Sequence, residues 1–517
     1  MNARHDVSAA ESPIAVRIAQ THGVAAALLF AQILASALLL RAAVPPNGVA
    51  AAAWFALVPL LLAIRGKSPG NAALVGFAFG VASLAAMHTW FLELPGANIW
   101  NASALFGYLA IYPAIWCAAL SLLRGRDLPW ILPGAVLWVL LDWGRSHAGF
   151  LALPWDALSH SQVVDLPLLQ LAAFGGAPAI AFVVCLANLA FARAVELRSA
   201  RPLAAPLALL VAAHALGFVH LQSAPSGGDL RVALIQPAAD GAPPAERLRT
   251  LLELTARAAR TNSGLIVWPE SEVSGFAGSP PVIARLAATA RAAKAALVFG
   301  SADFGKYAQE AGGRAGQIRF KNQAFMMLPD GTVRGPVTKN RLVPFAEYMP
   351  LGDRVEWPHW LIARQLHGIA GKNPEIFTLG DGTRIGVSIC WESLFSELAG
   401  RLVRHGASMI VQLSNDSDFG VSAEPAQHNA ASVLRAVEYA RPVFVASSSG
   451  PSMLIDAHGR VVDSLDSIGT AGWIARTVSL SGTTTAYQRF GMWWLVLLSA
   501  AALTDLVRRC AIHRRRS

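Results

Sequence analysis

Long apolar stretches alternate with short polar loops over the first part of the chain. Stretches of bilayer-spanning length lie near residues 23–43, 47–64, 71–92, 102–123, 129–144, 167–192 and 203–220, and another lies near 491–507. A transmembrane helix needs about 20 predominantly apolar residues. We therefore expect about seven transmembrane helices over 23–220 and a last one at 491–507. Segment 1–22 carries acids and bases and no cleavage site stands out after 23–43, so we expect that stretch to be retained.

Residues 221–490 show a different pattern, in which short apolar runs alternate with amphipathic stretches. The apolar runs lie at 231–236, 264–270, 295–301, 384–390, 407–415 and 441–448. Segments such as "PPAERLRTLLELTARAARTN" and "PPVIARLAATARAAKA" place apolar residues at helical spacing. The turns in "LPDGTVRG" and "IDAHGRVVD" indicate hairpins. This repetition predicts an α/β domain with buried strands, inserted before the last transmembrane helix.

Composition and charge agree with this division. Of the 517 residues 54% are hydrophobic and 14% are charged, against about 25% charged in a soluble protein. Most of the net charge of +10 lies in alternate loops and in the tail 508–517, so it gives no reason to expect a nucleic-acid partner. These basic positions are Arg65, Lys67, Arg124, Arg126, Arg193, Arg198, Arg201, Arg508, Arg509, Arg514, Arg515 and Arg516.

Basic loops stay on the cytoplasmic side of a membrane. The N-terminal segment 1–22 and the tail 508–517 are therefore predicted to be cytoplasmic. After seven crossings the domain 221–490 is expected outside, in a periplasm or its equivalent.

Polar residues stand where the predicted strands of this domain end. Glu270 closes "LIVWPE", Cys390 closes "GVSIC", and Asn415 and Asp416 close "IVQLSND". Function in layered α/β domains gathers at such strand ends. Cys390 is the only cysteine in 221–490, so it has no partner for a disulfide within the domain and leaves one thiol for chemistry.

Three segments carry a specific resemblance: "VWPESE", "TKNRLVPFAEYMPLG" and "ICWESLF". They resemble the catalytic motifs of the nitrilase superfamily, whose αββα sandwich carries a Glu, Lys, Cys triad. With the predicted helices, the chain resembles the superfamily's membrane branch, the bacterial apolipoprotein N-acyltransferase family. Segments "ALPWDALSHSQ" at 152–162 and "PAQHNAASVLRAVEYARP" at 425–442 are similar to that family as well.

The resemblance implies that Cys390 is the nucleophile, Glu270 the proton acceptor and Lys339 the cationic stabiliser. This division is chemically reasonable, because a thiol with an ordinary pKa near 8.5 needs a base, while an ammonium favours the thiolate. Glu347 and Glu392 match further acidic positions of the family. They are expected to orient Lys339 or relay protons, and the alternative is a structural ion pair.

Four residues are candidates for contact with substrate: Trp155, Phe345, Trp391 and Asp418. The two aromatic residues Trp155 and Phe345 are suited to guiding acyl chains, and ordinary packing or anchoring at the membrane interface explains them equally well. His428 is at least as readily a core or exposed histidine as an active one.

The resemblance further implies an enzyme of the bacterial inner membrane. It would move an acyl chain from a phospholipid, through a cysteine thioester, to the diacylglyceryl cysteine at the N-terminus of a lipoprotein. Neither a cofactor nor a metal is expected, because cysteine supplies the nucleophile and no dense cluster of metal ligands stands out in the sequence.

Departures from the family pattern concern the acceptor and the donor more than the triad. Gln236 is kept but no tryptophan follows it in "IQPAADGAPPAERL", Asp418 in "NDSDFG" replaces an aromatic residue, and "SSSG" stands at 447–450. A membrane-tethered amidase, or an acyltransferase for a different amine, therefore remains an alternative. A transporter or lipid-binding protein with a degenerate domain is the alternative of another class.

The orientation of the chain can be tested with reporter fusions. A reporter that is active only outside the cytoplasm should work when fused after residue 225 and fail when fused after residue 510, because the basic loops and tail stay inside. Activity in the reverse pattern would invalidate the predicted orientation.

Overall fold

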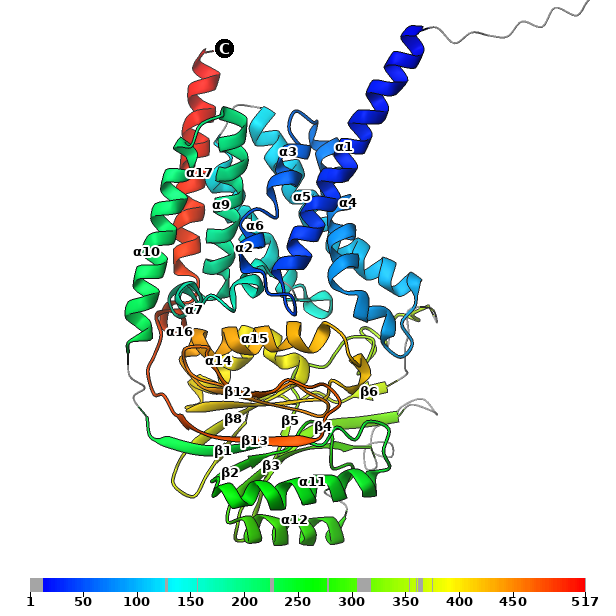
Figure 1. The fold of residues 1–517 in the computed structure, drawn as a ribbon, viewed down its shortest axis with the longest axis vertical. Helices are drawn as coiled ribbons and strands as arrows, with labels where there is room; N and C mark the ends of the chain where they lie inside the picture. Colours follow the sequence, from blue (N-terminus) through cyan, green and yellow to red (C-terminus); the bar gives the residue numbers. More distant parts are fainter. Residues whose placement is uncertain are drawn as a thin grey trace, which may run out of the picture.

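The computed structural model of the protein describes residues 13–125, 129–155, 157–223, 227–276, 279–304, 318–352, 354–358, 360, 366–373 and 375–516. A bundle of helices lies against one side of a layered α/β domain, and α17 at the C-terminal end returns to the bundle (Figure 1). The chain thus leaves the bundle once, builds the α/β domain and comes back.

The helices of the bundle follow the apolar stretches of the sequence. They are α1 (Pro13–Ala43), α2 (Ala50–Ala53), α3 (Val58–Ala63), α4 (Pro69–Met87), α5 (Ile99–Gly125), α6 (Ile131–Ser146), α7 (Leu166–Leu169), α8 (Leu171–Gly175), α9 (Ala177–Leu197), α10 (Ala204–Leu221) and α17 (Trp493–Arg516), with α16 (Ala486–Phe490) before the last. Among the described residues, five segments are long and apolar enough to cross a membrane: Gly23–Ala43, Pro69–Met87, Ile99–Arg124, Ala177–Leu197 and Arg201–Leu221.

Two predicted crossings differ in form from single long helices. The stretch 47–64 is divided into α2 and α3, and 167–192 begins with the short helices α7 and α8. The first division has a clear cause, because Pro59 at the start of α3 has no amide hydrogen to continue a preceding helix. Side chains bind two amides near this start: Asn188 accepts from Leu57 at 2.8 Å and Ser36 from Leu60 at 2.9 Å.

The α/β domain contains two sheets. The first has strand order β13-β1-β2-β3-β4-β5, with β6 paired to β4, and the second has the order β12-β11-β10-β9-β8-β7. The strands of the first sheet are β1 (Asp229–Gln236), β2 (Leu265–Val267), β3 (Ala296–Asp303), β4 (Ile318–Met327), β5 (Val333–Thr338), β6 (Leu366–Gly368) and β13 (Gly472–Ser479). Those of the second sheet are β7 (Ile376–Thr378), β8 (Arg384–Ile389), β9 (Met409–Ser414), β10 (Val443–Ser447), β11 (Ser452–Ile455) and β12 (Val461–Leu465).

Each sheet has a parallel centre joined by helices. Strands β1, β2 and β3 are parallel neighbours joined through α11 (Pro244–Ala258) and α12 (Pro280–Ala293). Strands β8, β9 and β10 are parallel neighbours joined through α14 (Ser396–Arg404) and α15 (Glu424–Tyr439). Such crossover connections bring the carboxyl ends of neighbouring strands to one edge of the sheet.

The layers are helix, sheet, sheet, helix, which confirms the predicted αββα sandwich. One apolar core fills the space between the sheets, including Val232, Val267, Val387 and Val411, and another lies between the first sheet and the pair α11 and α12. Helices α14 and α15 cover the second sheet and also face the bundle (Figure 1). The predicted strands and both hairpins are present, whereas β13, which pairs antiparallel with β1, was not predicted.

Helix α15 joins the sandwich to the bundle through polar contacts. Glu438, fully buried, accepts a hydrogen bond from the Ala177 amide at the start of α9 at 2.9 Å. Gln427 accepts from the indole nitrogens of Trp90 at 2.9 Å and Trp155 at 3.1 Å. Because buried polar groups lose free energy when their partners move away, these bonds fix the sandwich against the bundle.

Candidate active site

Three loops that follow strands bring the predicted triad together. Glu270 comes three residues after β2, Lys339 follows β5 directly, and Cys390 follows β8 directly. Strand β2 belongs to the first sheet and β8 to the second, so the site lies where the two sheets meet.

Lys339 is the centre of this arrangement. It is 1% exposed, and its Nζ lies 2.8 Å from Oε1 of Glu347 and 3.3 Å from Oε1 of Glu270. Burial opposes the charge of the ammonium, but the two carboxylates outweigh this and raise the pKa of Lys339 well above its ordinary value. Lys339 is therefore a permanent cation. Its contact with Glu347 is compatible with the predicted orienting role, which stays a prediction.

Glu270 is a buried carboxylate with two donors on one oxygen. Its Oε1 accepts from Lys339 and from Nδ2 of Asn322 at 2.5 Å. Burial, with the charge of Glu347, raises the pKa of Glu270 despite the opposing effect of Lys339. Gly300 permits the close turn after β2, because a side-chain carbon there would lie 2.6 Å from the Glu270 Cα.

Asn322 was not identified from the sequence. It stands in β4, in the polar run "KNQ", which has no pattern that singles out one residue, and Lys339, which it contacts, comes from the next strand's end. Its backbone carbonyl accepts from the Lys339 amide at 2.9 Å, so Asn322 contacts both the base and the lysine.

Cys390 lies in a backbone conformation that side chains rarely adopt. Its φ is +50°, at the point where β8 turns directly into the short 3₁₀ helix η8 (Cys390–Leu394). Such strained positions gather at functional sites. Burial, and then the negative charge of Glu270, raise the pKa of the Cys390 thiol, while Lys339 lowers it. The thiol is thus protonated at rest and depends on a base for activation.

Glu392 does not contact Lys339 through its side chain. Its Oε1 accepts from the amides of Asn340 at 2.6 Å and Arg341 at 3.1 Å, and its Oε2 accepts from the Ile389 amide at 2.8 Å. One carboxylate therefore joins the backbone after the lysine to the backbone before the nucleophile. This geometry makes Glu392 a positioning residue.

Two of the proposed substrate-contact residues pack next to the nucleophile. Trp155 is buried, and its ring stacks on Trp391 with centroids 6.1 Å apart and on His428 at 5.7 Å. Trp155 therefore belongs to the packed junction between bundle and sandwich. Contact of either tryptophan with substrate stays a prediction.

The other two lie in more open positions. Phe345 is partly buried, has a φ of +64° and packs edge-on against Trp357 at 5.0 Å. Asp418 is exposed in the 3₁₀ helix η9 (Ser417–Phe419), after β9. Their roles in substrate binding also stay predictions.

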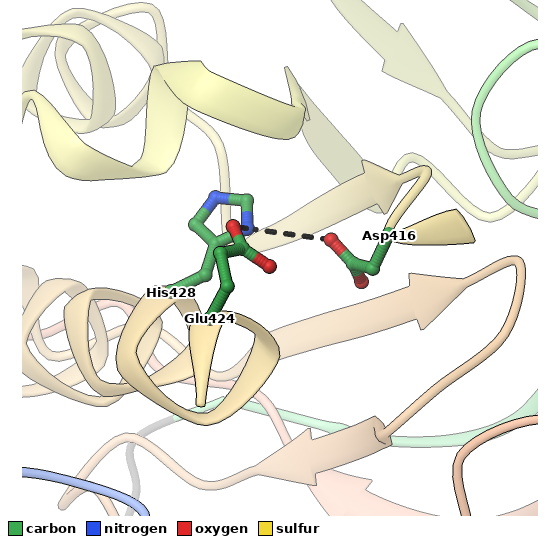
Figure 2. A group of neighbouring side chains, drawn as sticks. All are labelled: Asp416, Glu424 and His428. Carbon is green, nitrogen blue, oxygen red and sulfur yellow. Dashed lines mark ion pairs between the residues drawn. The ribbon is translucent and has the colours of Figure 1, made fainter. Parts of the chain in front are cut away.

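A second polar group lies beside Cys390. His428 on α15 points towards Asp416 after β9 and towards Glu424 one helical turn before it (Figure 2). One ligand atom from each residue lies within 4.8 Å of the others, and all three side chains are buried. The sequence signal was the pair Glu424 and His428 at a spacing of four on an amphipathic helix, which was not recognised as a cluster because Asp416 comes from a strand end.

Two family models match this chain. A family described as carbon-nitrogen hydrolase matches residues 231–488, and one described as apolipoprotein N-acyltransferase N-terminal domain matches residues 36–190. An amidase structure from Nesterenkonia sp. AN1 is 18% identical, covers 48% of this chain and 92% of that chain, and has a TM-score of 0.35.

Relatives match along nearly the whole chain, and those named here are called apolipoprotein N-acyltransferase. The protein from Geobacter metallireducens is 32% identical over 92% of this chain and 95% of its own length. The protein from Nitrosomonas europaea is 31% identical over 83% of this chain and 87% of its own length. The protein from Photobacterium profundum is 28% identical over 87% of this chain and 89% of its own length. The chain therefore belongs to the apolipoprotein N-acyltransferase family, the membrane branch of the nitrilase superfamily.

Proposed function

We propose that this chain is an apolipoprotein N-acyltransferase, which moves an acyl chain from a phospholipid to the α-amino group of a diacylglyceryl cysteine at the N-terminus of a lipoprotein. The observation that carries the proposal is the buried Lys339 between Glu270 and Glu347, next to Cys390, in a chain that matches this family over most of its length. The packed bundle supplies a membrane-embedded neighbour from which a lipid substrate can reach the site.

In the first half-reaction the Cys390 sulfur attacks the ester carbonyl carbon of the lipid while Glu270 takes the thiol proton. The carbonyl oxygen becomes negative, and the Lys339 ammonium stabilises it. Removing one such stabilising donor costs on the order of 3 kcal/mol of transition-state free energy. The carbon–oxygen bond then breaks, the proton passes from Glu270 to the leaving alcohol, and the acyl group remains on Cys390 as a thioester.

In the second half-reaction an amine attacks the thioester carbon. Glu270 takes the amine proton, the carbon–sulfur bond breaks, and the thiolate of Cys390 regains its proton from Glu270 as the amide is released. The same base, cation and nucleophile thus serve both halves, which predicts ping-pong kinetics.

We also propose that the sandwich 221–490 lies outside the cytoplasm, on the periplasmic face of the inner membrane. The basic loops between the helices and the basic tail support this orientation. It places the site on the side where exported lipoproteins carry their modified N-terminus.

The nucleophile can be tested by intact mass. Incubation of the detergent-purified protein with phospholipid should add one acyl mass that hydroxylamine removes, because a thioester is cleaved by this reagent. Cys390→Ala should gain no such mass, while Cys510→Ser should behave like the parent. A hydroxylamine-sensitive adduct of equal yield on Cys390→Ala would sink the assignment.

The protonation of Glu270 should appear in the pH dependence of acylation. Its pKa is raised by burial and by Glu347, so the base is lost as pH falls through this raised value. Removing the Glu347 charge lowers the pKa of Glu270, and Glu347→Gln should therefore shift the acidic limb of the acylation rate to lower pH. The rate itself should fall by up to about 100-fold, the cost of a misplacement of about 1 Å.

Glu397→Gln provides the control for this experiment. Glu397 is a partly exposed acid paired with Arg341 at 3.3 Å, and it is not among the charges that shift Glu270. The acidic limb of the acylation rate of Glu397→Gln should coincide with that of the parent protein. If the acidic limb of the acylation rate of Glu347→Gln stays at the parent's pH, or moves to higher pH, the role given to Glu347 is contradicted.

Transfer and hydrolysis differ in what discharges the acyl-enzyme. We expect the isolated acyl-enzyme to hydrolyse slowly and a diacylglyceryl-cysteine peptide to discharge it quickly, because a held amine has an effective molarity of about 10⁵ M or more. Discharge can be followed by loss of the acyl mass with time. Equal rates with and without peptide would favour the amidase alternative, and discharge by another amine alone would refute the lipoprotein acceptor.

A further inference from the structure

The group formed by Asp416, Glu424 and His428 has an unusual charge balance. Both carboxylates are at most 2% exposed, and the only described side chain that forms an ion pair with either is His428. The two ion-pair distances, from Nδ1 of His428 to Asp416 Oδ1 and to Glu424 Oε1, are 3.6 and 3.7 Å. These distances are too long for hydrogen bonds.

The other nitrogen of His428 defines the state of the ring. Its Nε2 lies 3.2 Å from the backbone carbonyl oxygen of Cys390, which can only accept, and 3.0 Å from the Ser393 hydroxyl. Nε2 therefore carries a hydrogen, and in the neutral ring the lone pair belongs to Nδ1. That lone pair faces two carboxylate groups with no hydrogen bond between them (Figure 2).

A second observation points to a missing partner. Oε2 of Glu424 is buried and has no hydrogen-bond partner among the described residues, although Glu424 is only 1% exposed. Buried carboxylate oxygens without a partner are rare and costly. Both oxygens of Asp416, in contrast, accept hydrogen bonds: Oδ1 from the hydroxyl of Ser414 at 2.8 Å and Oδ2 from that of Ser447 at 2.5 Å.

We propose that Asp416, Glu424 and His428 bind one divalent transition-metal cation, with zinc as the representative ion. Ligands at about 2.0–2.2 Å from a tetrahedral zinc lie about 3.3–3.6 Å from one another, close to the two measured separations. One imidazole nitrogen and two carboxylate oxygens suit zinc or manganese better than magnesium, which favours oxygen ligands alone. The cation neutralises both carboxylates and gives Glu424, whose buried Oε2 has no hydrogen-bond partner among the described residues, a charged partner.

The surroundings of the three residues resemble the outer shell of a metal site. The hydroxyls on Asp416 and the Cys390 carbonyl on Nε2 of His428 hold two of the ligands in orientation, as outer partners do in known sites. A cation on Nδ1 polarises the ring and strengthens the bond from Nε2 to the Cys390 carbonyl. The metal thereby stabilises the strained backbone at the nucleophile without contacting the substrate.

Zinc binding to the full-length protein tests the proposal. Protein in detergent is stripped with a chelator, desalted, titrated with zinc at neutral pH, and its bound metal is measured by mass spectrometry after removal of free ion. The parent should hold one zinc per chain more tightly than Glu424→Gln and His428→Gln, by at least about 100-fold. Zinc should raise the melting temperature of the parent, because it binds only the folded state, and leave that of both variants unchanged.

Asp418→Asn is the matched control, because it removes an exposed acid two residues from Asp416 and should bind zinc like the parent. Cobalt supplies a further readout, since an imidazole and carboxylate site gives visible absorption bands that both variants should lose. Binding of equal strength in parent and variants, or no stoichiometric binding by the folded parent, overturns the proposal. If the folded parent binds no stoichiometric zinc, a proton neutralises the cluster instead. Burial, and then the charge of Asp416, raise the pKa of Glu424, in agreement with that outcome. No acyl substrate is present, so either result is independent of the proposed function.

Discussion

A fully buried ammonium is the constraint on which the site depends. Lys339 loses its hydration on burial, and the carboxylates of Glu270 and Glu347, which form ion pairs with it, compensate for this loss. Removing one partner would leave the other charges buried and unbalanced, so the three side chains form one unit. The unit also explains two protonation states. The carboxylates raise the pKa of Lys339, so the lysine stays charged, while burial raises the pKa of the Cys390 thiol, which stays protonated until a base accepts its proton.

The backbone around this unit is held by a further carboxylate, whose hydrogen bonds go to backbone amides. Glu392 binds amides on both sides of the gap, after Lys339 and before Cys390, and therefore sets the distance between cation and nucleophile. Fixed donors act on a developing charge without having to reorganise, which is the main source of electrostatic catalysis. The sequence predicted that Glu392 orients Lys339 or relays protons, with a structural ion pair as the alternative, and its hydrogen bonds to backbone amides add a positioning role to these predictions.

The sequence predicted the features that depend on local patterns and missed those that depend on packing. Apolar runs identified the parallel strands that carry Glu270 and Cys390, and the resemblance identified Lys339, which no spacing could relate to them. In the stretch 47–64 Pro59 is a local signal for the break, but the apolar run hid it, and the side chains that bind the amides near the break, Asn188 and Ser36, are distant in the sequence. Asn322 and the group around His428 were missed because their contacts join residues from different strands and helices. The local sequence around each residue gives no sign of these contacts.

Helix α15 connects the membrane-facing part of the molecule to the chemistry. Nearly all of its residues are buried, because one side packs on the second sheet and the other on the bundle. Within one helix Gln427 binds Trp90 and Trp155, His428 contacts the Cys390 carbonyl, and Glu438 binds the start of α9. A shift of the bundle must therefore move the nucleophile or break buried hydrogen bonds, each worth about 1 kcal/mol or more. The bundle is thus a structural part of the active site as well as an anchor, and a sandwich cut away from it would lose the surface that holds α15 in place.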